Sequence, residues 1–156
     1  MNTQRFSMIS FLVIGLATVS IAAGQEKKIQ RTELPPAVEK TVAEQSKAGR
    51  IRGFSTEMED GKRLYEVELT VNGHGKNISM DAQGNVVEVE EEIFMNSLPP
   101  AVRKGLTEAA KGGTILKIES ITKNHKLVAY EADVRSAAKR SEIQVGPDGK
   151  ALSHPE

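Results

Sequence analysis

The side chains that most often carry enzymatic chemistry are scarce in this sequence. There is no cysteine, and no serine lies in a G-x-S-x-G motif, so the usual arrangements for nucleophilic catalysis are missing. The three histidines, His74, His125 and His154, are far apart; two fall in predicted turns and one near the C-terminus. No histidine cluster with zinc-ligand spacing occurs. The sequence therefore predicts a protein that is not an enzyme, with no catalytic residue, metal or cofactor.

Carboxylates are locally abundant. Glu88 and the run Glu90–Glu92 form the densest cluster, and Glu88 and Glu90 would face the same side of a strand. Glu66 and Glu68 alternate in the same way and are expected to lie across the sheet from them. One interpretation is weak Ca²⁺ binding, which needs several oxygen ligands. The favoured interpretation is a solvated, charged edge that discourages aggregation between sheets.

Charge is distributed unevenly along the chain. Residues 33–96 contain 7 basic and 13 acidic residues, a net charge of −6, whereas residues 97–156 contain 10 and 7, a net charge of +3. Drift of solvated faces after a duplication explains this difference, and a polarised binding surface is the alternative. Neither half is basic enough to predict a nucleic-acid partner.

The pentapeptide LPPAV occurs twice, at Leu34–Val38 and Leu98–Val102, and each copy predicts the start of a helix. Proline suits the first helical turn, where its missing N–H is not needed. Apolar residues four positions apart follow each copy and would share one buried helix face. Glycine follows each stretch and is a fitting C-terminal stop. The expected helices run from Pro36 to about Ala48 and from Pro100 to about Lys111.

After each helix the apolar pattern changes to a period of two, which is typical of half-buried strands. Short turns separate the strands and predict an antiparallel meander. The order of matches is kept along two units, residues 33–96 and 97–156, which indicates an internal repeat. The expected fold class is α+β, with two tandem α-β-β-β-β units side by side, each a helix packed on a four-stranded antiparallel meander sheet. One continuous sheet of eight strands is the weaker alternative.

One helix can cover only one face of such a sheet, so the other face is expected to be open to water. In Tyr65–Val71 and Val128–Arg135 the polar residues of the alternating pattern would point to that open face. The candidate partner-binding residues are Glu66, Glu68, Thr70, Glu131, Asp133 and Arg135.

The first 24 residues have the pattern of a secretory signal peptide. One early arginine precedes an apolar run over about residues 8–19, and Ala22 and Gly24 form a cleavage signal. The run is short for a membrane span of about 20 residues. We expect cleavage after residue 24, a flexible segment over residues 25–32, no membrane span in the mature chain, and a periplasmic or secreted location.

An exported chain with two LPPAV helix starts, a YEVEL strand and the hairpins DAQGNVVEV and GPDGKAL resembles the tandem PepSY-like domains grouped with β-lactamase-inhibitor-like proteins. The resemblance covers about residues 34–153 and implies a helix on a four-stranded sheet, twice. It also implies binding or inhibition of other proteins, often hydrolases, in the periplasm or outside the cell. Two tyrosines and no tryptophan make this chain poor in the aromatic anchors typical of tight interfaces.

Together these features predict an exported, non-enzymatic protein-binding module. Its partner would be an envelope or secreted protein, such as a hydrolase, that it inhibits or regulates. The alternative function is an acidic periplasmic protein that binds Ca²⁺ or responds to metal.

Overall fold

The computed structural model describes residues 26–156 except 60, 138, 153 and 155, so the predicted signal peptide lies outside the described residues. Within this part, no helix has the length and apolar character needed to cross a membrane. Short 3₁₀ turns flank both helices. The helices and strands are, in chain order, β1 (Lys27–Ile29), α1 (Pro36–Gln45), β2 (Arg50–Glu59), β3 (Lys62–Val71), β4 (His74–Met80), β5 (Val86–Glu92), α2 (Pro100–Ala109), β6 (Thr114–Lys123), β7 (Lys126–Arg135) and β8 (Arg140–Val145).

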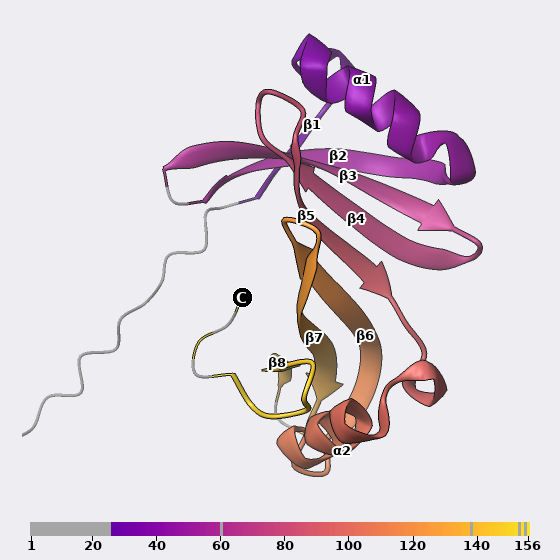
Figure 1. Cartoon of the computed structure of the whole chain (residues 1–156), viewed down its shortest axis with the longest axis vertical. Coiled ribbons are helices and arrows are strands. Elements are labelled where there is room, and N and C mark those ends of the chain that lie inside the picture. Colours follow the sequence, from indigo (N-terminus) through magenta and orange to yellow (C-terminus); the bar gives the residue numbers. More distant parts are fainter. Residues whose placement is uncertain (1–25, 60, 138, 153, 155) are drawn as a thin grey trace, which may run out of the picture.

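All eight strands form one antiparallel sheet in the order β1 to β8 (Figure 1). The predicted fold class, two tandem units of one helix and four strands, is therefore wrong: residues 26–156, as far as the structure describes them, are mostly β, with two helices on a single sheet. β1 precedes α1 and pairs with β2, and only β6, β7 and β8 follow α2. The alternating pattern located strands but could not show that β5 pairs with β6. This pairing satisfies backbone N–H and C=O groups that would remain unpaired at the edges of two separate sheets.

Both helices begin at the second proline of LPPAV, as predicted. Pro36 and Pro100 occupy the first turns, and Val38, Val42, Val102 and Leu106 are buried. Each helix packs its apolar face on a different part of the sheet and forms its own hydrophobic cluster. The first cluster joins α1 to β2–β4, and the second joins α2 to β6–β8.

A glycine turn rests against the first turn of each helix. Gly84 has a φ of 78°, and a Cβ there would lie 2.5 Å from the carbonyl oxygen of Ala37. Gly149 has a φ of 79°, and a Cβ there would lie 2.2 Å from the carbonyl oxygen of Ala101. These turns require glycine both for conformation and for close approach, and they fix each helix over its part of the sheet.

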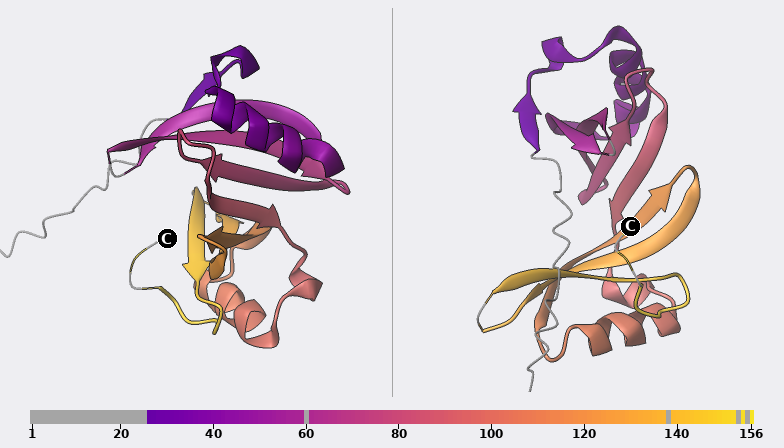
Figure 2. Two further views of the ribbon diagram at one scale, coloured as in Figure 1. Left: turned by 45° about the horizontal axis from the view of Figure 1, so that its top comes forward. Right: turned by 90° about the vertical axis from the view of Figure 1, so that its left-hand side faces the viewer.

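The sheet twists and bends strongly between its two ends. In Figure 1, α1 lies at the top and α2 at the bottom, and β2 and β3 run nearly across the direction of β6 and β7. The helices lie on the outer sides, so the two parts of the sheet turn their helix-free surfaces toward each other (Figure 2). We call this helix-free surface the inner face.

Candidate functional site

The six candidate residues all lie on the inner face. Glu66, Glu68 and Thr70 project from β3, and the other three project from β7. Strand register shows that these two groups share one face. Residues that pair directly across neighbouring strands lead from Glu68 through Asn77, Glu90 and Ile121 to Ala129, which points to the same side of β7 as the three candidates there. The two groups do not form one compact cluster, since β4, β5 and β6 separate them.

The inner face is less exposed than the sequence suggested. Five of the six candidate residues are half-buried, and only Arg135 is exposed. The inner face also contains buried residues, among them Leu64, Ile121 and Ala129. In the described part of the chain no helix covers this side, so we attribute the burial to the bend of the sheet, which the strand pattern alone could not predict.

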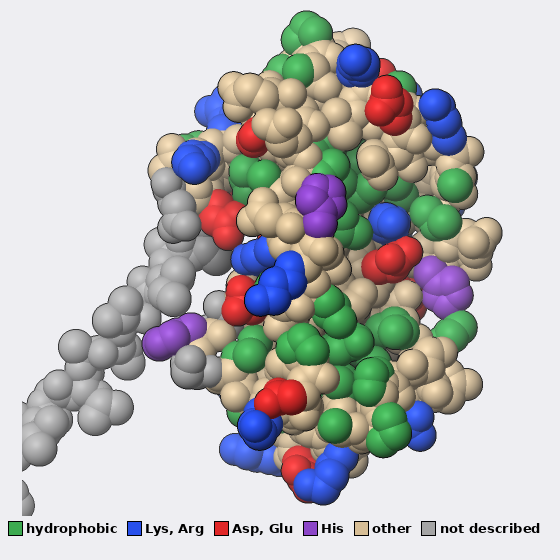
Figure 3. Space-filling view, in the orientation of Figure 1, with side chains coloured by type: hydrophobic (Ala, Val, Ile, Leu, Met, Phe, Trp, Pro, Cys, Tyr) green, Lys and Arg blue, Asp and Glu red, His purple; other side chains and the backbone are tan. Residues whose placement is uncertain are grey.

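Carboxylates outnumber cations on this face. Figure 3 shows charged side chains of both signs at the left of the view, between the two ends. Strand register places on this face the carboxylates of Glu57, Glu59, Glu66, Glu68, Glu88, Glu90, Glu92, Glu119, Glu131, Asp133 and Glu142. Glu26 lies next to them, just before β1. The cations are Lys28, Arg50, Lys62, Lys117, Lys123, Lys126, Arg135 and Arg140.

Half of these cations are paired with carboxylates. Lys117 lies 2.6 Å from Glu119, whose side chain is only 8% exposed. The Nζ of Lys123 lies 3.3 Å from Glu88. Arg140 lies 3.3 Å from Asp133.

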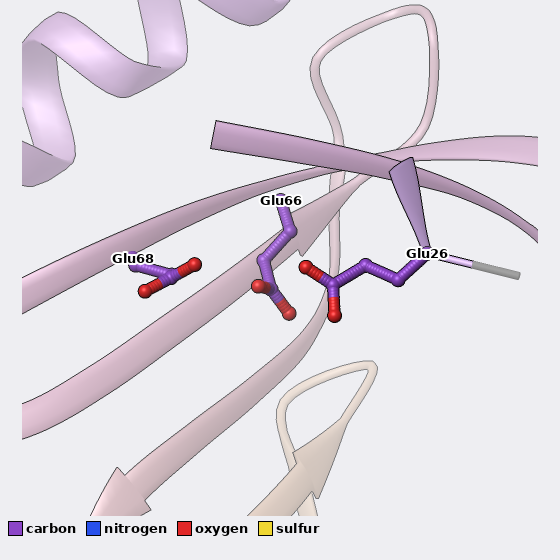
Figure 4. Close-up of side chains that lie close together, drawn as sticks. All are labelled: Glu26, Glu66 and Glu68. Atoms are coloured by element: carbon purple, nitrogen blue, oxygen red, sulfur yellow. The ribbon is translucent and has the colours of Figure 1, made fainter. Parts of the chain in front are cut away.

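Lys28 of β1 bridges two further carboxylates. Its ammonium pairs with Glu26 at 2.9 Å and donates a hydrogen bond to Glu68. Carboxylate oxygens of Glu26, Glu66 and Glu68 lie within 4.8 Å of one another (Figure 4). Hydrogen bonding to Glu68 and Glu26 raises the pKa of Lys28, so the ammonium remains charged there. Sequence reasoning missed Lys28, because it lies in the segment expected to be flexible.

Three inner-face glutamates have neutral hydrogen-bond donors instead of cations. Glu66 accepts from the Ser55 hydroxyl at 3.3 Å, Glu90 from the Asn77 amide at 3.2 Å, and Glu131 from the Gln144 amide at 2.7 Å. Among the described residues, no ion pair includes these three carboxylates.

Their pKa values reflect this arrangement. Burial raises the pKa of Glu66 to about 7, and the negative charges of Glu26 and Glu68 contribute. Burial likewise raises the pKa of Glu90 to about 7, with Glu119 contributing. For Glu131 the pKa is raised, again mainly by burial. This surface can hold protons near neutral pH and can attract a basic group.

The histidines lie at separate places. His74 begins β4 and contacts Phe94 edge to face, with ring centroids 4.6 Å apart. His125 lies in the turn between β6 and β7 with a φ of 64°. His154 follows the last strand and is exposed. The structure therefore does not bring them together.

Comparisons with known proteins identify the fold. No family model matches the chain, and no curated protein matches it. Solved structures do match. A protein assigned to the periplasm, from Bacteroides eggerthii, has a TM-score of 0.63 at 13% identity, covering 76% of this chain and 86% of its own. A DUF2874 family protein from Bacteroides ovatus has a TM-score of 0.61 at 17% identity, covering 77% and 85%.

A third structure, a BLIP-like protein from Bacteroides fragilis, has a TM-score of 0.55 at 19% identity, covering 74% of this chain and 81% of its own. At these identities the likeness concerns the fold and not the site residues. The chain therefore has a BLIP-like fold.

Proposed function

We propose that the chain is a non-enzymatic protein-binding module of the periplasm, which inhibits or regulates an envelope or secreted protein such as a hydrolase. The BLIP-like fold supports a binding role, and a structural neighbour assigned to the periplasm supports the location. The tandem PepSY-like relationship that the sequence motifs imply is part of the same proposal.

The inner face is the surface that we assign to the partner. The observation that carries this assignment is its excess of half-buried carboxylates, some of which have no cation of their own. A basic side chain of a partner would supply the missing positive charge to Glu66, Glu90 or Glu131. Complementary charge of this kind mainly accelerates association and excludes partners of the wrong sign.

Charge reversal tests this assignment. We expect the double variant Glu66→Lys, Glu68→Lys to weaken partner binding by about tenfold or more at low salt, mainly through slower association. The chain from residue 25 to 156 would capture proteins from an envelope and culture-medium extract of its source organism. Mass spectrometry would identify them, and surface plasmon resonance would measure association rates for the purified partner.

The matched control is Glu44→Lys, Glu108→Lys, which makes the same charge change on exposed positions of the two helices. The control should bind like the unmodified chain, and thermal melts must show that both variants are folded. Equal binding by all three proteins would remove the inner face from consideration. Failure to enrich any protein at low salt would contradict the binding role itself.

Calcium binding is the alternative function, and the Glu26, Glu66 and Glu68 carboxylates are its strongest structural support. The ammonium of Lys28 already supplies positive charge among them, so we expect millimolar Ca²⁺ to leave the unfolding midpoint unchanged. A ligand that binds only the folded state must raise this midpoint. Thermal melts with Ca²⁺ and with a chelator test for calcium binding, and a higher unfolding midpoint with Ca²⁺ would favour this alternative function.

A further inference from the structure

The two parts of the sheet are joined by the β5–β6 ladder. β5 and β6 form five residue pairs, from Glu88↔Lys123 to Glu92↔Glu119, as many as β4 and β5, whereas β2–β3 and β6–β7 form nine each. The two hydrophobic clusters lie on either side of this ladder and share no buried residue. The β5–β6 ladder is therefore the joint between two separately packed parts.

Glu90 lies in the middle of this joint, where it pairs with Ile121. Its nearest polar partner is the neutral Asn77 amide on β4. The charges that face it from β5, β6 and β3 are mostly negative, and the two cations among them are each paired with a carboxylate, Lys117 with Glu119 and Lys123 with Glu88. These neighbours are Glu88, Glu92, Glu119, Lys117, Lys123 and Glu66.

Glu66 lies two strands away on the same face, with β4 between them. Its surroundings are also mainly negative, and Lys28 pairs with Glu26 and Glu68 instead of Glu66. The groups that face Glu66 are Glu26 and Lys28 at β1, Ser55 and Glu57 on β2, Glu68 on β3, Ser79 on β4 and Glu90 on β5.

We propose that protonation of Glu66 and Glu90 controls the joint: the protonated pair keeps the bend closed, and the ionised pair loosens the β5–β6 ladder. When both carboxyls lose a proton, two uncompensated negative charges appear among carboxylates that are already ionised. Repulsion then opposes the bend that buries them. This inference concerns the chain alone and does not depend on the partner-binding role.

The direction of the pH effect follows from the pKa values of the two carboxyls in the unfolded and the folded chain. In the unfolded chain both groups ionise near their ordinary value of 4.5, and in the folded chain near 7. Between these values the folded protein holds more protons than the unfolded one, so stability falls as pH rises from 4.5 to 7 and then levels off.

Thermal melting and amide hydrogen exchange test the proposal. We expect the unfolding midpoint to fall by about 5 °C or more between pH 5 and 7.5. After correction for intrinsic chemistry, β5 and β6 amides should exchange roughly tenfold faster at pH 8 than at pH 6. The variant Glu66→Gln, Glu90→Gln should lose most of both effects, and Glu44→Gln, Glu108→Gln should retain them. Equal pH dependence in the two variants would overturn the proposal.

Carboxyl NMR of the unmodified protein provides a measurement that needs no variant. The side-chain carbons of Glu66 and Glu90 should titrate near pH 7, and the β5 and β6 amide shifts should follow the same midpoints. Titration of both carbons below about pH 5.5, close to ordinary glutamate values, would overturn the proposal.

Discussion

Replacing Gly105 with alanine is expected to destabilise the protein by about 2–3 kcal/mol, in the range of overpacking substitutions. A Cβ at this position of α2 would lie 2.0 Å from the carbonyl oxygen of Gly149. Alanine favours a helix over glycine by about 1 kcal/mol, but the clash involves backbone that cannot move as a side chain would. The turn at Gly149 must withdraw from α2, which opens the second hydrophobic cluster. Thermal or urea unfolding measures the loss.

Gly53→Ala is the matched control for this prediction. A Cβ there would meet only the Glu68 side chain, at 3.5 Å, which is ordinary contact. This variant should unfold within about 1 kcal/mol of the unmodified protein. If Gly105→Ala melts at or above the unmodified protein, the close packing of α2 on the Gly149 turn is wrong.

Local signals in the sequence predicted local structure well. The proline pair located the start of both helices, because it acts within one turn of the chain. Alternation of polar and apolar residues placed Glu66 and Glu131 on one face, because side-chain direction in a strand has a period of two. Such signals depend only on neighbouring residues, so they remain valid whatever the tertiary arrangement.

The joining of the sheet depends on contacts between distant residues and was not predictable in the same way. The pairing of β5 with β6 brings residues 88–92 beside 119–123, and no local pattern specifies this partner. β1 has only three residues, too few for an alternating pattern to reveal. These two pairings account for the difference between the predicted pair of units and the observed single sheet.

The sequence predicted which residues share the inner face, but not how buried they are or which charges lie beside them. Alternation identified its residues, whereas their burial follows from the bend of the sheet. The pairing of β5 with β6 places Glu119 and Lys117 near Glu90, and β1 places Lys28 beside Glu68. Which carboxylates have a cation and which do not is therefore a tertiary property. Burial is the main cause of the raised pKa of Glu66 and of Glu90, and the neighbouring negative charges add to it.

Leu106→Ala is expected to cost about 2–5 kcal/mol, as for other fully buried leucines. Leu106 is 0% exposed and belongs to the cluster beneath α2. The first cluster shares none of its buried residues, and the short β5–β6 ladder is the main connection between them. We therefore expect the loss to be local: amides of α2 and β6–β8 should exchange faster, while α1 and β2–β4 keep their protection.

Val42→Ala is the reciprocal variant, since Val42 is equally buried beneath α1. Its effect should be confined to α1 and β2–β4, at about 1–3 kcal/mol for the smaller side chain. Leu116→Ala, at a 41% exposed position, should change stability by less than about 0.5 kcal/mol. If either buried variant accelerates exchange uniformly over all eight strands, the two clusters unfold as one unit. The β5–β6 ladder would then transmit stability across the bend instead of acting as a joint.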